Sequence, residues 1–174
     1  MISLSAQKIL GQVAPLEIGL TVRDLEGSLA FWRDALGLAE ISRIDNPVDT
    51  ACSSGIASGA YTVVRLQLPG GERLKLFEPV APAGAAHPGE RPLSTVGLAF
   101  ITLIVDDIAG VIDDMAARSF EARLPDPVEL RPGVFVALVD DPDGNVVELV
   151  QYVDLAVYRP ELALHRARIA VGPA

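Results

Sequence analysis

Two stretches of the sequence recur further along the chain, and this repeat limits the folds that the chain can adopt. The segment PGGERLKLFE (69–78) aligns with PDGNVVELVQ (142–151) at an offset of 73 residues. Upstream, EIGLTVRDLEG (17–27) aligns with FITLIVDDIAG (100–110) at an offset of 83 residues. The larger upstream offset means that the first copy holds 10 additional residues between these segments. We place this insertion in 44–59, whose Asn, Pro, Asp, Ser and Gly content predicts a loop.

Each copy is expected to contain a strand, a helix and three further strands. The first strand, 16–22 or 97–105, alternates in polarity and leads into an aspartate that can cap a helix, Asp24 or Asp107. Gly-Gly and Asp-Gly turns introduce the last strand of both copies. The pattern predicts an α+β fold of two βαβββ modules. The remaining expected strands are 38–44, 60–68 and 73–78 in the first copy and 120–124, 133–139 and 145–151 in the second.

These elements also divide the chain. Pro, Ala and Gly residues mark a linker between the modules, and Pro160 suits the first turn of a helix in the C-terminal tail. We expect that tail to be partly helical and to pack on its own chain or on a partner chain. The expected divisions are an N-terminal extension (1–15), the first module (16–79) with its inserted loop (44–59), the linker (80–95), the second module (96–152) and the tail (153–174).

The composition argues against several classes of partner. The formal net charge is −9 and no segment is rich in Lys or Arg, so we expect neither nucleic acid nor an anionic membrane as a partner. No apolar run approaches the roughly 20 residues that cross a bilayer, and the N-terminus lacks the pattern of a secretory signal. We therefore expect a cytoplasmic protein. The absence of a basic cluster also argues against phosphorylated or CoA-linked substrates.

Two motifs resemble a known superfamily. The segments IGLTVRDLEGSLAFWRDALGL (18–38) and DDPDGNVVELVQ (140–151), on a duplicated frame, are similar to the vicinal oxygen chelate superfamily. That superfamily includes glyoxalase, bleomycin-resistance and extradiol dioxygenase proteins, and the resemblance covers about residues 16–152. It implies that the modules form a curled, mostly antiparallel sheet around a cavity and that the chain forms a homodimer. Members typically hold a divalent metal between the first and fourth strands of two modules.

Strand alternation predicts which side chains face that cavity, because successive residues of a strand point to opposite sides of the sheet. Ile18, Leu20 and Val22 form an apolar row that should pack against the helix. The residues between them, and their counterparts on the other three strands, then face the cavity. These are Glu17, Gly19 and Thr21; Arg73, Lys75 and Phe77; Phe100, Thr102 and Ile104; and Val146, Glu148 and Val150.

The resemblance places Glu17, Lys75, Phe100 and Glu148 at the positions of the family's metal ligands. A catalytic metal usually needs about three protein ligands, but Phe100 has no donor atom and the Lys75 ammonium repels a cation. The two histidines fall in the linker and the tail. We therefore expect no cofactor, and a metal-dependent lyase or dioxygenase stays an alternative.

What remains is an ammonium group between two carboxylates, with Lys75 offsetting the charge of Glu17 or Glu148. One interpretation is a metal-independent isomerase, epimerase or lyase, in which Glu148 is the general base, Lys75 stabilises an oxyanion and Glu17 holds Lys75. A second is a bleomycin-resistance-like protein that binds or sequesters a compound, with the charged groups as polar lining. A third is a structural ion pair, or a Lys75 side chain that extends into solvent.

The neighbouring side chains indicate the character of the ligand. Most are apolar, which favours a small molecule with substantial apolar area. Trp32 and Phe31 are expected in the core or at the module interface. The directions of Tyr61 and Arg65 stay open, as does the substrate. The candidate substrate-binding residues are Thr21, Arg73, Phe77, Phe100, Thr102, Ile104, Val146 and Val150.

Overall fold

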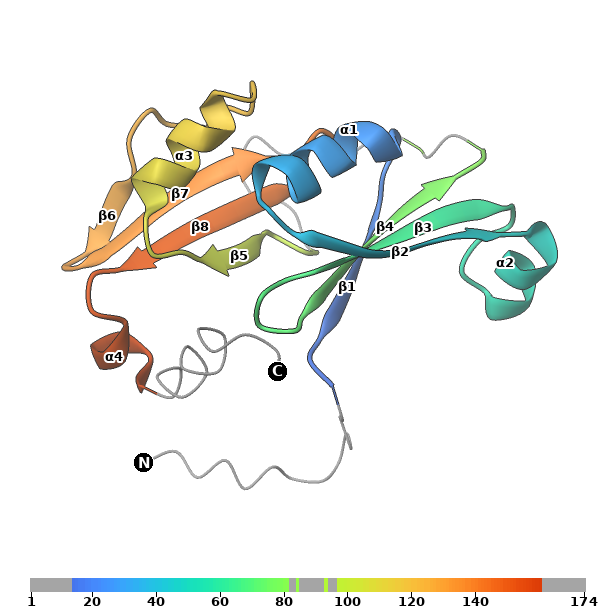
Figure 1. Ribbon diagram of the computed structural model, residues 1–174, viewed down its shortest axis with the longest axis horizontal. Coiled ribbons are helices and arrows are strands. Elements are labelled where there is room, and N and C mark those ends of the chain that lie inside the picture. The colour runs from blue at the N-terminus through green and yellow to red at the C-terminus, as the bar shows by residue number, and fades with distance from the viewer. Residues whose placement is uncertain (1–13, 82–83, 85–92, 94–96, 161–174) are drawn as a thin grey trace.

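The computed structural model describes residues 14–81, 84, 93 and 97–160, which contain two βαβββ modules (Figure 1). The α+β class and the duplicated order of elements are confirmed. The first module contains β1 (Glu17–Thr21), α1 (Leu25–Leu29), which continues as a π-helix, η1 (Ala30–Ala35), then β2 (Ala39–Asn46), α2 (Val48–Ser54), β3 (Tyr61–Gln67) and β4 (Arg73–Pro79). The second contains β5 (Ile101–Ile104), α3 (Ile108–Ala116), β6 (Val128–Arg131), β7 (Val134–Asp140) and β8 (Val146–Tyr152), followed by α4 (Leu155–Tyr158).

Each module forms one four-stranded sheet, in the order β1-β4-β3-β2 or β5-β8-β7-β6. The first strand pairs in parallel with the last, and the other pairings are antiparallel, so the sheets are mostly antiparallel as expected. Gly19 lies opposite Lys75, and Thr102 lies opposite Glu148. These pairs occupy the same position in the two frames, as the two sequence offsets predict. Within one chain the sheets stay separate and do not close into a single curled sheet.

The N-terminus of each module's first helix is held by two side chains. Asp24 accepts hydrogen bonds from the backbone N–H groups of the first turn of α1 at 3.1 and 3.2 Å, and Asp107 accepts one in α3 at 3.0 Å. Both caps were predicted. The last strand supplies a second acceptor in each module, because Glu78 and Gln151 each accept the N–H of the first helical residue at 2.9 Å. In both modules, therefore, a side chain of the last strand forms a hydrogen bond with the first residue of the helix.

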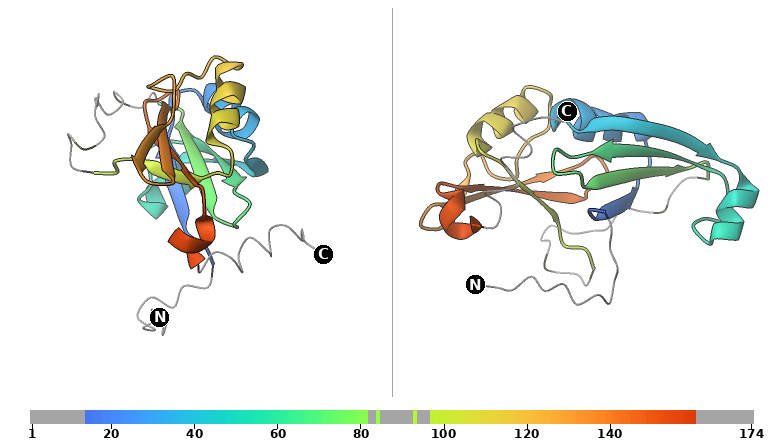
Figure 2. Two further views of the ribbon diagram at one scale, coloured as in Figure 1. Left: turned by 90° about the vertical axis from the view of Figure 1, so that its left-hand side faces the viewer. Right: turned by 60° about the horizontal axis from the view of Figure 1, so that its bottom comes forward.

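Helices α1 and α3 lie on the same side of the two sheets (Figure 1, Figure 2) and share one apolar core with both of them. The row of Ile18, Leu20 and Val22 packs into this core, as alternation predicted. Phe31 contributes to it too, with its ring centroid 5.1 Å from that of Phe120 in an edge-to-face arrangement. The side of each sheet that faces away from α1 and α3 is called its open face below.

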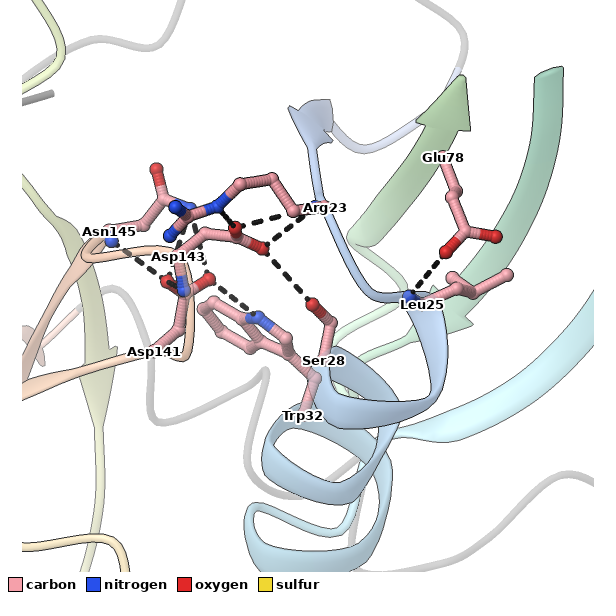
Figure 3. A network of polar contacts seen from close by, with 8 residues as sticks. All are labelled: Arg23, Leu25, Ser28, Trp32, Glu78, Asp141, Asp143 and Asn145. Atoms are coloured by element: carbon pink, nitrogen blue, oxygen red, sulfur yellow. Dashed lines mark hydrogen bonds and ion pairs between the residues drawn. The ribbon is translucent and has the colours of Figure 1, made fainter. Parts of the chain in front are cut away.

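A buried polar network joins the two modules where the turn between β7 and β8 meets the start of α1 (Figure 3). Trp32 donates its indole N–H to Asp141 at 3.2 Å, and both residues are at most 4 % exposed. Asn145 donates its backbone N–H to the same carboxylate at 2.8 Å. Next to it, the guanidinium of Arg23 pairs with Asp143 at 2.7 Å. The expected place of Trp32 in the core or the module interface is therefore confirmed.

The segment 44–59 is not the loop that its composition predicted. Its first residues extend β2, and Val48–Ser54 form α2 at the far end of the first sheet (Figure 1). The helix forms because Ala51 is fully buried against Tyr61 and Val63 on the open face, with Phe77 packed beside them. The preference of these residue types for a loop is thus outweighed by the burial of Ala51.

The second strand of the second module was also misplaced. Residues 120–124 make only one isolated bridge, from Ala122 to Val139, whereas the strand is β6 at 128–131. All four residues of β6 are exposed, so no alternation of polarity marks this edge strand in the sequence. In addition, β5 begins at Ile101, which leaves Phe100 just before the strand.

The start of the tail forms the short helix α4, whereas the helix predicted from Pro160 onward falls almost entirely outside the described residues. Tyr158 of α4 packs against Tyr152 of β8, with their ring centroids 5.4 Å apart, so α4 rests on its own chain. The rest of the tail, with His165, and most of the linker, with His87, lie outside the described residues. No helix in the described part of the chain is both long and apolar enough to cross a membrane.

Candidate functional site

A carboxylate on the open face of the first sheet holds two cations. Glu17 lies 3.0 Å from the Nζ atom of Lys75 and 3.3 Å from an Nη atom of Arg73. The hydrogen bond from Lys75 is the main reason why the pKa of Glu17 is lowered, so Glu17 is ionised at neutral pH. Lys75 is only 28 % exposed, which argues against a side chain that extends into solvent. The predicted pairing of Lys75 with Glu17 is present.

A third cation lies on the same face, although the sequence did not predict the side of the sheet to which its side chain points. Arg65 of β3 stands directly opposite Lys75, and its guanidinium donates to the hydroxyl of Ser42 at 3.2 Å. No carboxylate among the described residues pairs with Arg65. We call Arg65, Arg73 and Lys75 the cationic band. The expectation of no basic cluster was therefore wrong, because the fold gathers cations that are spread over eleven positions of the sequence.

Apolar side chains occupy the end of this face that is nearest to α2. The Phe77 ring lies 5.6 Å from that of Tyr61, centroid to centroid. It also passes over β1, where a Cβ atom on Gly19 would come within 2.9 Å of the ring. Glycine is thus required at position 19 to admit the ring. Thr21 stands opposite Phe77 in the register and is exposed.

The open face of the second sheet carries a carboxylate that a neighbouring hydroxyl holds in place. Glu148 of β8 accepts a hydrogen bond from the Thr102 hydroxyl of β5 at 2.7 Å. Its neighbours on the same face of the strand, Val146 and Val150, are 9 % and 5 % exposed. Ile104, two residues beyond Thr102 on β5, is 40 % exposed. Thr102, predicted only to bind substrate, is the residue that positions Glu148.

The predicted cluster of two carboxylates around one ammonium does not form within a chain. No hydrogen bond or ion pair joins Glu148 to Lys75 or Glu17 in the part of the chain that the structure describes. Instead, Lys75 pairs with Glu17 on the first sheet, and Glu148 pairs with Thr102 on the second. Sequence alternation placed each residue on the correct face, but it did not fix the distance between the two sheets.

The fold and these two faces define a class: duplicated βαβββ proteins with polar groups on the first and last strands of both modules. The model of the Glyoxalase/Bleomycin resistance protein/Dioxygenase superfamily matches residues 10–149. The chain belongs to this superfamily, and the resemblance of its motifs is confirmed.

Solved structures show the same fold. A glyoxalase family protein from Bacillus cereus is 17% identical, with a TM-score of 0.69 over 86% of this chain and 99% of that one. The trypanothione-dependent glyoxalase I of Leishmania major is 22% identical, with a TM-score of 0.62 over 90% of this chain and 99% of that one. No sequence among the curated proteins matches this chain. At these identities the likeness shows the fold and leaves the reaction to be argued from the site.

The residues that the resemblance places at the family's ligand positions are poorly suited to a divalent metal. The Lys75 ammonium lies 3.0 Å from Glu17 and so holds the carboxylate that a metal would need. Phe100 offers no donor atom, and Glu148 is bonded to a threonine hydroxyl on the other sheet. Fewer ligands remain than the roughly three that a catalytic metal usually takes from the protein.

Proposed function

We propose that the chain is a metal-independent enzyme that moves a proton next to a carbonyl group of a largely apolar small molecule. The observation that carries this proposal is the Glu148 carboxylate, which Thr102 fixes at 2.7 Å beside the buried Val146 and Val150. A carboxylate held in place beside apolar side chains is suited to general-base catalysis. Lys75, which Glu17 holds on the first sheet, supplies a positive charge opposite to that of Glu148.

The proposed step starts when Glu148 removes a proton from the carbon next to the carbonyl. The electron pair of the broken C–H bond then moves toward the carbonyl, whose oxygen becomes negative. Lys75 donates a hydrogen bond to that oxygen and stabilises its charge. If a proton from solvent adds to the same carbon on its opposite face, and Glu148 releases its own proton to solvent, the product is an epimer. Return of the proton from Glu148 to another carbon gives an isomer. If a neighbouring group leaves instead, Glu148 passes the proton to it, which is a lyase reaction.

Deuterium exchange tests this reaction without knowledge of the natural substrate. We expect the protein, treated with a chelator, to exchange protons next to the carbonyl for solvent deuterium in part of a panel of apolar ketones and acids in D₂O, followed by ¹H NMR. Chelation should not change the rate, because the ligand positions suit no metal. Exchange that depends on an added divalent metal, together with about one metal per chain by elemental analysis, would restore the metal-dependent alternative.

We also propose that a homodimer completes the site, with the open face of one chain's first sheet meeting the open face of the partner's second sheet. This arrangement is supported by the separation of Lys75 and Glu148 on two sheets that do not close within one chain. Lys75 on the first face and Glu148 on the second also carry charges of opposite sign. A ligand between them would contact both groups.

Mixing two inactive variants tests this arrangement. Lys75→Met and Glu148→Gln chains, unfolded and refolded together, should recover about a quarter of wild-type exchange, since half of random dimers are mixed and each mixed dimer holds one intact site of two. Each variant refolded alone serves as the control. Recovery at the level of those controls, or a monomer by light scattering, would refute a site shared between chains.

A second candidate function is binding or sequestration without chemistry. It is favoured by one observation: Lys75 and Glu148 each have their own partner, Glu17 and Thr102, and no contact joins them. A compound that copurifies with the protein, identified by mass spectrometry, and that binds without deuterium exchange would select this function.

A further inference from the structure

We propose that the cationic band binds a carboxylate group, so that the substrate of the proposed enzyme is an organic acid with an apolar body. This inference deepens the proposed function and rests on it for the word substrate. The site consists of Arg65, Lys75 and Arg73 on the open face of the first sheet, with Phe77 and Tyr61 beyond them.

The first step is the charge balance of this face. The four strands place three cations on it, and the carboxylate beside them, Glu17, is already shared between Arg73 and Lys75. Two positive charges are left over in a chain whose formal net charge is −9. Cations concentrated in this way on an acidic protein mark a place where an anion is stabilised.

The second step is the opposition of two like charges. Arg65 and Lys75 are direct cross-strand partners, a position in which Cβ atoms lie about 5 Å apart and like charges destabilise the sheet. An anion bound between the two groups would attract both of them and so offset their repulsion.

The third step is the set of donors that Arg65 has to offer. Its guanidinium carries five N–H donors in a planar fork, and the hydrogen bond to Ser42 uses one of them with a neutral acceptor. Arg65 is half-buried and has no carboxylate partner among residues 14–81 and 97–160. The fork suits the two oxygens of a carboxylate, which it can hold through two parallel hydrogen bonds. Lys75 then remains available for the carbonyl oxygen.

The fourth step is the direction of the apolar body. Phe77 lies two residues beyond Lys75 on β4, and Val63 lies two residues from Arg65 on β3. At about 3.3 Å per residue, this apolar end is roughly 7 Å from the cations. The buried Ala51 of α2 closes it. The matching ligand carries its carboxylate a few bonds away from an apolar group.

A pair of probes that differ only in charge tests the inference. We expect 4-phenylbutanoate to bind more tightly than the neutral 4-phenylbutanamide in isothermal titration. Arg65→Met should weaken binding of the acid on the order of 10-fold or more, because a hydrogen bond between charged groups is lost, and leave the amide unchanged. Arg118→Met is the matched control, since Arg118 is exposed, lies in the second module, and its guanidinium donates a hydrogen bond to a backbone carbonyl of α3. The Arg65 variant should melt at or above the wild-type temperature, because a like-charge contact is removed.

Equal affinity of the wild type for the acid and the amide would overturn the inference. So would an equal loss of acid binding in the two arginine variants. Because these titrations measure binding alone, their failure can be told apart from failure of the proposed function. Acid binding that depends on Arg65, without deuterium exchange, would keep the carboxylate site and reject the enzyme.

Discussion

Replacing Glu148 by Gln should lower the rate of deuterium exchange by about 10² to 10⁴, the usual contribution of a general base. The amide has nearly the shape of the carboxylate, and its oxygen can still accept the hydrogen bond that Thr102 donates at 2.7 Å. It cannot take up a proton at neutral pH. The melting temperature should therefore stay close to that of the wild type, and the loss should appear in kcat.

Glu121→Gln provides the matched control, because it makes the same change of charge and shape at an exposed residue of the second module. It should exchange deuterium at the wild-type rate. If the Glu148 variant also exchanges normally while folded, Glu148 is not the base. The sequestering function would then be the better account of the two faces.

Replacing Asp141 by Ala should lower the free energy of unfolding by about 3 kcal/mol at pH 7, as expected when buried donors lose their acceptor. Asp141 accepts hydrogen bonds from Trp32 at 3.2 Å and from the backbone of Asn145 at 2.8 Å. The variant would leave the indole N–H of Trp32, a residue only 1 % exposed, without its acceptor. Denaturant unfolding of the two proteins measures the difference. A change below about 0.5 kcal/mol, the range of ordinary surface substitutions, would contradict the role of this network.

The effect of the same substitution should depend on pH. Burial raises the pKa of Asp141 in the folded protein above its ordinary value of 3.8. The folded state therefore binds this proton more readily than the unfolded state, and the stability gained is lost as pH rises through the folded pKa. Alanine cannot titrate, so the substitution should cost more at pH 4 than at pH 7. Glu121→Ala is the control for a carboxylate that the fold does not bury.

Much of the frame could be predicted because it obeys local rules. The repeat fixed the number of modules, and alternation fixed the faces of Lys75 and Glu148 on their strands. Asp24 and Asp107 capped helices because a short carboxylate just before a helix can reach the free N–H groups of its first turn.

The direction of Arg65 could not be predicted because β3 is buried on both faces. Val64 packs into the core, whereas its neighbour Val63 is covered from the open side by α2. Apolar residues therefore stand next to each other in the sequence, and the alternation that reveals a face is lost. Only the register of β3 with β4 places Arg65 opposite Lys75. The cationic band is thus a product of pairing between strands, which no single segment encodes.

The shared register of the two modules has a consequence for symmetry. Gly19 and Lys75 occupy the position in the first module that Thr102 and Glu148 occupy in the second. Two identical modules related by a twofold axis would present the same residue from both sides, so an acid would face an acid and a cation would face a cation. Covalent duplication removes that restriction. Once the copies are joined in one chain, one can keep the cation and the other the acid, and a single site can offer both charges to one ligand.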